Sequence, residues 1–142
     1  NLIKQINKSL KSNGFFIATI PDKNNIYQLV NSMYETDKKI YGGVYRRFNP
    51  TLDINTIIKL LKKFNFDIPT INNDKITIEY DTFKKLLFDL KSTNSPYIYL
   101  DRKKNFENKK YFDELGLIYK KNYYKNAYII DINVNIISAW KK

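Results

Sequence analysis

The hydrophobic and polar positions of the first twenty residues predict a helix followed directly by a strand. Apolar residues recur at helical spacing over residues 2–12, and Gly14 follows as a helix stop. Residues 15–20 are apolar almost throughout, which is typical of a strand covered on both faces. A helix that leads into such a strand is half of a crossover unit in a parallel α/β sheet. Because no strand precedes this helix, we expect the chain to be the back part of a larger α/β domain.

The same periodicities predict the remaining elements. Further helices are expected at residues 24–39, 54–64, 82–91 and 106–124, and strands at residues 66–71, 75–80 and 128–140, with a turn at residues 72–74. Asp53 is the expected N-cap of the helix 54–64, and Leu52 and Ile57 are placed to form a hydrophobic staple. In the last strand the even positions are mostly apolar, so we expect them, including Trp140, to be buried.

The composition indicates one folded domain or part of one. At 142 residues and 43% hydrophobic residues, the chain can bury one core and is not wholly disordered. No apolar run reaches the ~20 residues that a membrane-spanning helix needs. The net charge of +11 is compatible with nucleic acid, an anionic membrane or an acidic partner. All but three of the 25 basic residues are lysine, which together with abundant Asn, Ile and Tyr indicates an AT-rich genome. We therefore favour solvated lysines and do not expect a nucleic-acid partner.

The absence of cysteine and histidine removes several kinds of chemistry. Disulfides, thiolate nucleophiles, zinc ribbons, serine–histidine relays and imidazole-bound iron are excluded within this chain, and no metal site is expected. General acid–base chemistry would have to use Asp, Glu, Tyr or Lys. No catalytic residue is assigned from the sequence.

Several motifs carry a resemblance to a known family. The order of elements and the segment Leu10-Lys11-Ser12-Asn13-Gly14 resemble the second half of class I S-adenosylmethionine-dependent methyltransferases. The motif Gly42-Gly43-Val44 with Arg47-Phe48-x-Pro50 resembles the GGxSPRxxPF segment of the methyltransferase-like assembly factors of mitochondrial complex I and their bacterial relatives. Three further segments match in order: Asp74-x-Ile76-x-Ile78-x-Tyr80, Asp89-Leu90-Lys91 and Ser138-Ala139-Trp140-Lys141. Methyltransferases of the malonyl carrier protein in biotin synthesis share much of this architecture.

The sequence departs from the assembly-factor pattern at three places. Arg46 stands where the family tends to have proline, and Thr51 where it often has phenylalanine. Residues 92–96 replace the usual glycine-containing turn after Asp89-Leu90, which puts the contribution of this turn to the substrate side in doubt.

The resemblance implies a fold and a function. The fold would be the C-terminal part of a doubly wound Rossmann-like sheet, with an antiparallel last strand beside the fifth strand and helices on both faces. Residues 1–142 would be the substrate-side portion of one domain, inactive alone, with S-adenosylmethionine bound mainly by an N-terminal half outside this sequence. A protein substrate in complex I assembly is implied, in the mitochondrial matrix, or in the cytoplasm if the protein is bacterial. The alternatives are a malonyl-carrier-protein O-methyltransferase and a non-enzymatic interaction domain; a basic nucleic-acid-binding module is a third class.

Four residues are candidates for substrate binding. Gly42 and Gly43 permit unusual backbone angles or close approach of a ligand, or simply end a helix. Arg47 is suited to hold a carboxylate or phosphate, or to form a salt bridge with Asp53. Asp89 could bind a cation or act as a base, although a local ion pair on its lysine-rich helix is the simpler hypothesis. The tyrosines are more consistent with helix and strand packing than with base stacking, and they are Tyr119, Tyr123, Tyr124 and Tyr128.

Overall fold

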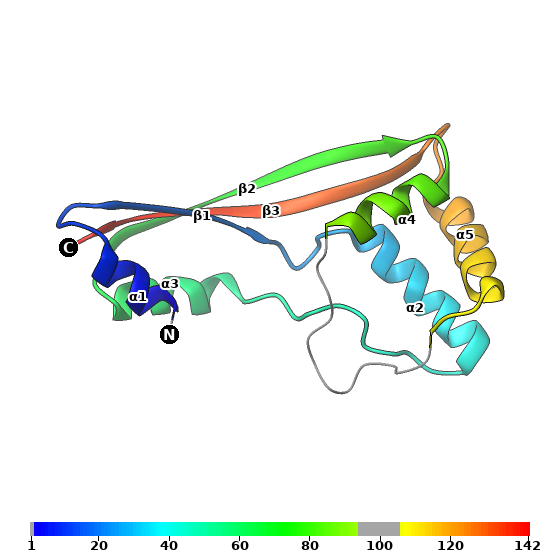
Figure 1. Ribbon diagram of the computed structural model, residues 1–142, viewed down its shortest axis with the longest axis horizontal. Helices are drawn as coiled ribbons and strands as arrows, with labels where there is room; N and C mark the ends of the chain where they lie inside the picture. The colour runs from blue at the N-terminus through cyan, green and yellow to red at the C-terminus, as the bar shows by residue number, and fades with distance from the viewer. Residues whose placement is uncertain (1, 94–105) are drawn as a thin grey trace. The chain divides into compact units, whose positions relative to one another are not determined.

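The computed structural model describes residues 2–93 and 106–142, which form five helices and three strands (Figure 1). The helices are α1 (Leu2–Ser9), α2 (Tyr27–Tyr41), α3 (Ile54–Lys63), α4 (Phe83–Ser92) and α5 (Lys109–Tyr123). The strands are β1 (Phe15–Pro21), β2 (Phe66–Tyr80) and β3 (Tyr128–Lys141). The sheet has the order β1-β3-β2, and β3 runs antiparallel to β1. These elements confirm the predicted α/β class.

The described residues divide into two compact units, each with its own hydrophobic core. The first unit comprises residues 2–25, 50–75 and 133–142. The second comprises residues 26–49 and the described part of residues 76–132. The long strands β2 and β3 contribute residues to both units.

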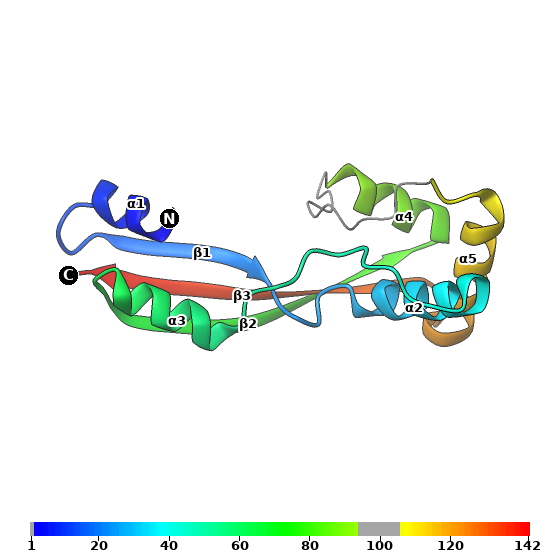
Figure 2. The same cartoon turned by 90° about the horizontal axis from the view of Figure 1, so that it is seen from below.

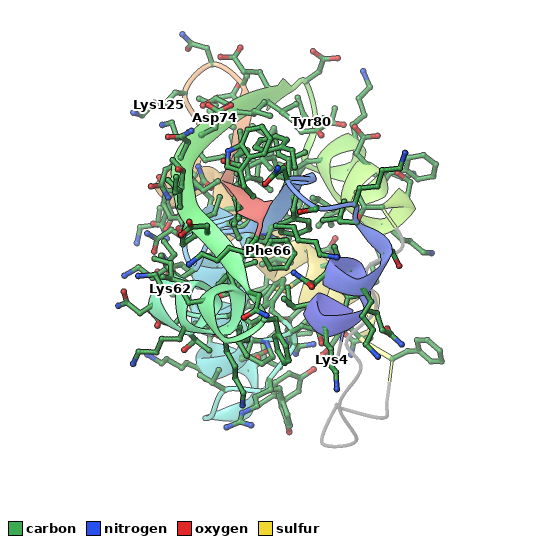
Figure 3. All side chains as sticks on the ribbon, turned by 90° about the vertical axis from the view of Figure 1, so that its left-hand side faces the viewer. Lys4, Lys62, Phe66, Asp74, Tyr80 and Lys125 are labelled. Atoms are coloured by element: carbon green, nitrogen blue, oxygen red, sulfur yellow. The ribbon has the colours of Figure 1, made fainter. Side chains whose placement is uncertain are left out.

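In the first unit, α1 and α3 pack against the same face of the sheet (Figure 2). Phe66 is 2% exposed and lies between the two helices, whereas Lys4 and Lys62 point away from it into solvent (Figure 3). The other core residues of this unit include Ile6, Leu10, Phe16, Ile57, Leu61, Ile137 and Ala139. The helices of this unit therefore cover one face, and the expectation of helices on both faces is not met within it.

The pairing of β1 with β3 decides which residues face these helices. The register places Phe15 opposite Trp140 and Pro21 opposite Val134. Phe16, Ile137 and Ala139 face the core, while Phe15 and Trp140 are in contact on the other face, with their ring centroids 4.7 Å apart and their planes tilted by 49°. Trp140 is 49% exposed, so its predicted place in the core is wrong. Side chains alternate along a strand, so the odd positions of β3 are buried in this unit instead of the even ones.

β2 is continuous through the predicted turn at residues 72–74. The Asn-Asn-Asp sequence there has turn character, but the amide of Asn73 donates to the side chain of Asn135 on β3. This cross-strand contact satisfies an asparagine within a sheet, and tertiary pairing overrides its local preference. Pro69 is tolerated because β2 lies at the end of the sheet order, where a missing N–H costs little.

Helix ends were predicted with mixed success. Asp53 caps α3 by accepting a hydrogen bond from the N–H of Thr56 at 3.1 Å, as predicted. Leu52 is largely exposed, so the predicted hydrophobic staple is absent. After α1, it is Asn13 that adopts the left-handed conformation, with φ 58°, and not Gly14. Gly14 is required for another reason: a Cβ atom there would lie 2.8 Å from the carbonyl oxygen of Lys11.

The core of the second unit is built from α2, α4, α5 and β3. Leu86, Leu115, Tyr119 and Ile130 are fully buried in it. The hydroxyl of Tyr119 donates to the carbonyl of Ile129 at 2.7 Å, and its ring packs against those of Tyr123 and Tyr128. The tyrosines therefore serve packing, as their spacing indicated. None of the helices among the described residues has the length and apolar character to cross a membrane.

Phe66 tests the core of the first unit, and the exposed Phe88 of the second unit is the control. We expect Phe66→Ala to lower the free energy of unfolding by about 3–5 kcal/mol, because it leaves a cavity beneath α1 and α3. The matched variant Phe88→Ala, at a side chain that is 70% exposed, should change it by less than about 0.5 kcal/mol. Urea unfolding followed by circular dichroism measures both. Equal losses in the two variants would contradict this core.

Candidate functional site

Arg47 lies where three segments of the second unit meet: the end of α2, the loop at residues 42–49 and the start of α5. Gly42 ends α2 with φ 70° and donates its N–H to the carbonyl of Lys38 at 3.0 Å. Glycine adopts this left-handed conformation without strain, which reverses the chain direction at the helix end. The reversed loop brings Arg47 back to Asp37, which lies one turn before the end of α2.

The guanidinium of Arg47 contacts two carboxylates. Nη2 and Nε donate to Oδ1 and Oδ2 of Asp37 at 2.6 and 3.1 Å, a two-pronged contact that matches the carboxylate. Nη2 also donates to Oε1 of Glu107 at 2.6 Å. The side chains of Asp37, Glu107 and Arg47 are 0%, 9% and 15% exposed, respectively. These charges are largely removed from water, so their pairing matters far more than that of a surface salt bridge.

Asp37 receives two further hydrogen bonds. The N–H of Tyr45 donates to Oδ2 at 3.0 Å, and the hydroxyl of Tyr111 donates to Oδ1 at 2.9 Å. Burial alone would raise the pKa of Asp37, but the hydrogen bonds from Arg47, Tyr45 and Tyr111 outweigh it and hold this pKa below its ordinary value. Asp37 is therefore an ionised carboxylate at neutral pH.

The same surroundings change the protonation of the two neighbouring groups. Burial would lower the pKa of Arg47, but its hydrogen bonds to Asp37 and Glu107 raise it above the ordinary value. Burial raises the pKa of Tyr111, and although the charge of Arg47 opposes this change, the hydrogen bond to Asp37 adds to it. Arg47 therefore stays charged, and Tyr111 stays a neutral donor.

Two tyrosine rings contact the guanidinium, and a third stacks on one of them. The Cζ atom of Arg47 lies 4.8 Å from the ring centroid of Tyr111 and 5.8 Å from that of Tyr45, within cation–π range. The ring of Tyr41 stacks on Tyr111 with a centroid distance of 6.1 Å, and its hydroxyl donates to Oε2 of Glu107 at 2.5 Å. We call the set that surrounds Arg47 the guanidinium cage; it comprises Asp37, Tyr41, Tyr45, Glu107 and Tyr111.

The structure places the four predicted site residues at two locations. Gly42 and Gly43 begin the loop that carries Arg47, and no atom lies within 4 Å of a Cβ built at either glycine. The close approach of a ligand to these glycines stays a prediction, while the alternative role of Gly42 as a helix stop is confirmed. The predicted salt bridge between Arg47 and Asp53 is wrong, because Arg47 pairs with Asp37 and Glu107. Glu107 is 60 residues away in sequence, which explains why no local pattern pointed to it.

Asp89 contacts a residue outside the guanidinium cage. It is exposed on α4 and accepts a hydrogen bond from the hydroxyl of Tyr80 at 3.0 Å. Among the described residues, Asp89 thus pairs with the hydroxyl of Tyr80 and not, as predicted, with a charged neighbour on its own helix. Burial and the hydrogen bond to Asp89 raise the pKa of Tyr80, so the pair is a neutral donor and a carboxylate acceptor.

The described residues do not form a nucleotide cradle. Such a cradle uses a glycine-rich loop between a strand and the first turn of a helix. The four glycines of the sequence lie elsewhere: Gly14 leads into β1, Gly42 and Gly43 follow α2, and Gly116 lies within α5. These residues thus do not fit S-adenosylmethionine by themselves. Within residues 2–93 and 106–142, no three acidic, histidine or cysteine side chains are grouped to hold a metal ion.

Comparison with known proteins identifies relatives of the chain, although no family model matches it. Arginine-hydroxylase NDUFAF5, mitochondrial, of Dictyostelium discoideum is 30% identical over 118 residues, which cover 83% of this chain and 27% of that protein. The proteins of the same name from Mus musculus and Homo sapiens are 27% identical over 89 and 88 residues. The homologues of this chain are NDUFAF5 proteins. The chain spans about a quarter of the length of these relatives.

The relationship to NDUFAF5 confirms the resemblance that the motifs carried. The names of these relatives assign them to mitochondria and to the modification of arginine. The guanidinium cage surrounds Arg47, which belongs to the Gly42-Gly43 and Arg47 motif on which that resemblance was based.

The ionised form of Asp37 should make stability depend on pH. Its pKa is lower in the folded state than its ordinary value of 3.8, so its contribution is complete above that pH and is lost as pH falls through the folded pKa. At neutral pH, Asp37→Asn should lower the free energy of unfolding by about 3–5 kcal/mol, because Arg47 loses a buried partner. Urea unfolding at several pH values should show this difference shrinking below pH 3.8.

The control for this experiment is Asp113→Asn, at an exposed carboxylate on the same helix as Tyr111. Its stability should follow that of the unmodified protein across the pH range. A penalty for Asp37→Asn that stays constant down to the lowest pH would argue against an ionised, paired Asp37.

The hydroxyl of Tyr111 can be tested separately. Tyr111→Phe keeps the ring beside Arg47 but removes a hydrogen bond to a buried carboxylate, which should cost about 1.5–3 kcal/mol. Tyr124→Phe, at a tyrosine that is 40% exposed, is the matched control and should change stability by less than about 0.5 kcal/mol. Thermal unfolding of both variants gives the comparison, and equal melting temperatures would contradict the assigned contact.

Proposed function

We propose that this chain is the substrate-side portion of a methyltransferase-like assembly factor for mitochondrial complex I that acts on an arginine of a protein substrate. The observation that carries this proposal is the 118-residue match to the NDUFAF5 protein of Dictyostelium discoideum, which covers most of the chain. The name of that relative is the basis for proposing an arginine as the modified residue and the mitochondrion as the location. The matrix is the proposed compartment, in line with the family that the motifs resemble.

The sheet supports the place of the chain in such a fold. In methyltransferases the reversed last strand is inserted beside the fifth strand, and here the antiparallel β3 lies beside β1. We therefore assign β1 as the fifth strand and β3 as the last strand of a methyltransferase-like sheet. The face of β1 and β3 that α1 and α3 leave uncovered carries Phe15, Ile17 and Trp140. An apolar face of this kind is suited to a further layer of the same domain, contributed by residues outside these 142.

The cofactor in this proposal is S-adenosylmethionine. Since the described glycines form no cradle for it, residues outside these 142 would bind it. This chain would position the substrate, which fits the location of Gly42, Gly43 and Arg47 at a helix end and in the loop that follows it. The reaction type is open in this proposal: methyl transfer adds a CH₂ unit to the arginine, whereas hydroxylation adds one oxygen atom.

Depletion of the protein from its source cells tests the proposal. We expect mature complex I to fall and assembly intermediates to accumulate on native gels, with recovery on return of the unmodified gene. Mass spectrometry of complex I subunits should show an arginine that loses its modification on depletion, and the mass gain identifies the reaction. The control is the Asp113→Asn gene, which alters an exposed residue outside the guanidinium cage and should rescue fully.

Two results would contradict separate parts of the proposal. Normal complex I after complete depletion would remove the assembly function. Calorimetry of the protein together with any upstream sequence its gene encodes tests the cofactor, because the absence of any heat with S-adenosylmethionine would exclude it while leaving the assembly function standing.

A further inference from the structure

The guanidinium cage has the features that a site for an arginine side chain requires. A guanidinium group binds tightly where a carboxylate faces two of its N–H groups, a second acceptor meets another, and an aromatic ring covers its plane. Asp37, Glu107 and Tyr111 supply these three contacts to Arg47, at 2.6 and 3.1 Å, 2.6 Å and 4.8 Å respectively. A lysine could not reproduce the two-pronged contact, so the cage is selective for arginine.

Most of the cage lies outside the loop that carries Arg47, and only Tyr45 shares that loop. Asp37, Tyr41 and Tyr111 are held on α2 and α5, which pack against each other in the second unit. Arg47 instead comes from the loop at residues 42–49, which follows two glycines with open space around them. Because 15% of the Arg47 side-chain surface is exposed to solvent, the cage opens to the surface. The side chain can therefore leave by rotating its own bonds while α2 and α5 keep Asp37, Tyr41 and Tyr111 in place.

The surface around this opening is aromatic. Two members of the cage, Tyr41 and Tyr45, are each more than one third exposed. Val44 and Phe112, which adjoin cage residues in the sequence, are exposed to a similar extent. Tyrosine, phenylalanine and arginine are enriched at the centres of protein interfaces. A peptide segment on either side of a bound arginine would therefore find a suitable surface at this position.

We infer that the guanidinium cage is the site that receives the arginine side chain of the protein substrate, and that Arg47 occupies it as an internal pseudosubstrate. This inference rests on the proposed function, from which it takes the arginine-bearing substrate. Arg47 keeps the buried carboxylates paired when no substrate is present. An incoming arginine makes the same contacts and displaces Arg47 from the cage.

Competition with Arg47 makes a specific prediction about affinity. When a site is closed for most of the time, the apparent Kd of its ligand equals the intrinsic Kd divided by the fraction of time that the site is open. Removing Arg47 therefore strengthens the binding of an external arginine, whereas removing Asp37 abolishes it. A purely structural Arg47 would give no binding of external arginine to the unmodified protein.

The probe is a tripeptide with central arginine, acetylated and amidated at its ends, with citrulline and lysine peptides as matched probes. Calorimetry should give an affinity for the arginine peptide at least about tenfold higher in Arg47→Gln than in the unmodified protein, because Arg47 closes the cage for most of the time. Arg46→Gln, an exposed neighbouring arginine, should leave the affinity unchanged. Asp37→Asn combined with Arg47→Gln should bind no peptide, and the citrulline and lysine peptides should not bind any variant.

A second measurement uses the unmodified protein, so its result does not depend on whether Arg47→Gln folds. In the unmodified protein, the Nε–H resonance of Arg47 should shift in nitrogen-edited NMR spectra as arginine peptide is added, because its hydrogen bond to Asp37 is lost. The Nε–H resonance of Arg46 is the internal reference. An Arg47 resonance that does not move up to saturating concentrations of the peptide, or equal affinities in folded Arg47→Gln and the unmodified protein, would overturn the inference.

The outcomes separate this inference from the proposed function. If complex I still depends on the protein but no arginine peptide displaces Arg47, the cage is not the substrate site and the assembly function stands. If the peptide binds as described but depletion leaves complex I normal, the cage is an arginine site and the proposed function fails.

Discussion

The burial of one carboxylate governs the candidate site. Asp37 has no exposed side-chain surface, and an ionised carboxylate in such a position is tolerated only when charged or polar donors surround it. Arg47, the N–H of Tyr45 and the hydroxyl of Tyr111 meet this requirement from two separate segments of the chain. The need to pair Asp37 thus fixes the course of the loop after α2 and the place where α5 begins.

Helix ends reinforce this arrangement. Arg47 sits beside the last turn of α2, where the helix dipole favours a cation, and Glu107 lies just before the first turn of α5, where it favours an anion. Gly42 supplies the left-handed residue that turns the chain back along α2. One glycine and two helix termini therefore bring together groups that are far apart in the sequence, and the two-pronged contact with Asp37 fixes the orientation of the guanidinium.

The periodic pattern predicted the helices well because their apolar stripes are local. Asp53 was assigned as a cap for the same reason, since its partner Thr56 is three residues away. The strand faces depended on non-local information. Both faces of β3 carry apolar residues near its end, so alternation alone did not show that Ile137 would be buried and Trp140 exposed. The pairing with β1 and the packing of α1 and α3 on one face decide this, and no local pattern encodes either.

The site shows the same division between local and distant information. Arg47 was identified from a motif, and its nearest acidic residue downstream, Asp53, was the obvious partner in sequence. The structure uses Asp53 as a helix cap, which requires its carboxylate at the N-terminus of α3 and leaves Arg47 to Asp37 and Glu107. A motif that ends a helix with glycine and places arginine five residues later therefore has a geometric meaning. It sets the arginine beside a carboxylate on the preceding turn of the helix, and the start of α5 then completes the pairing from a distant part of the sequence.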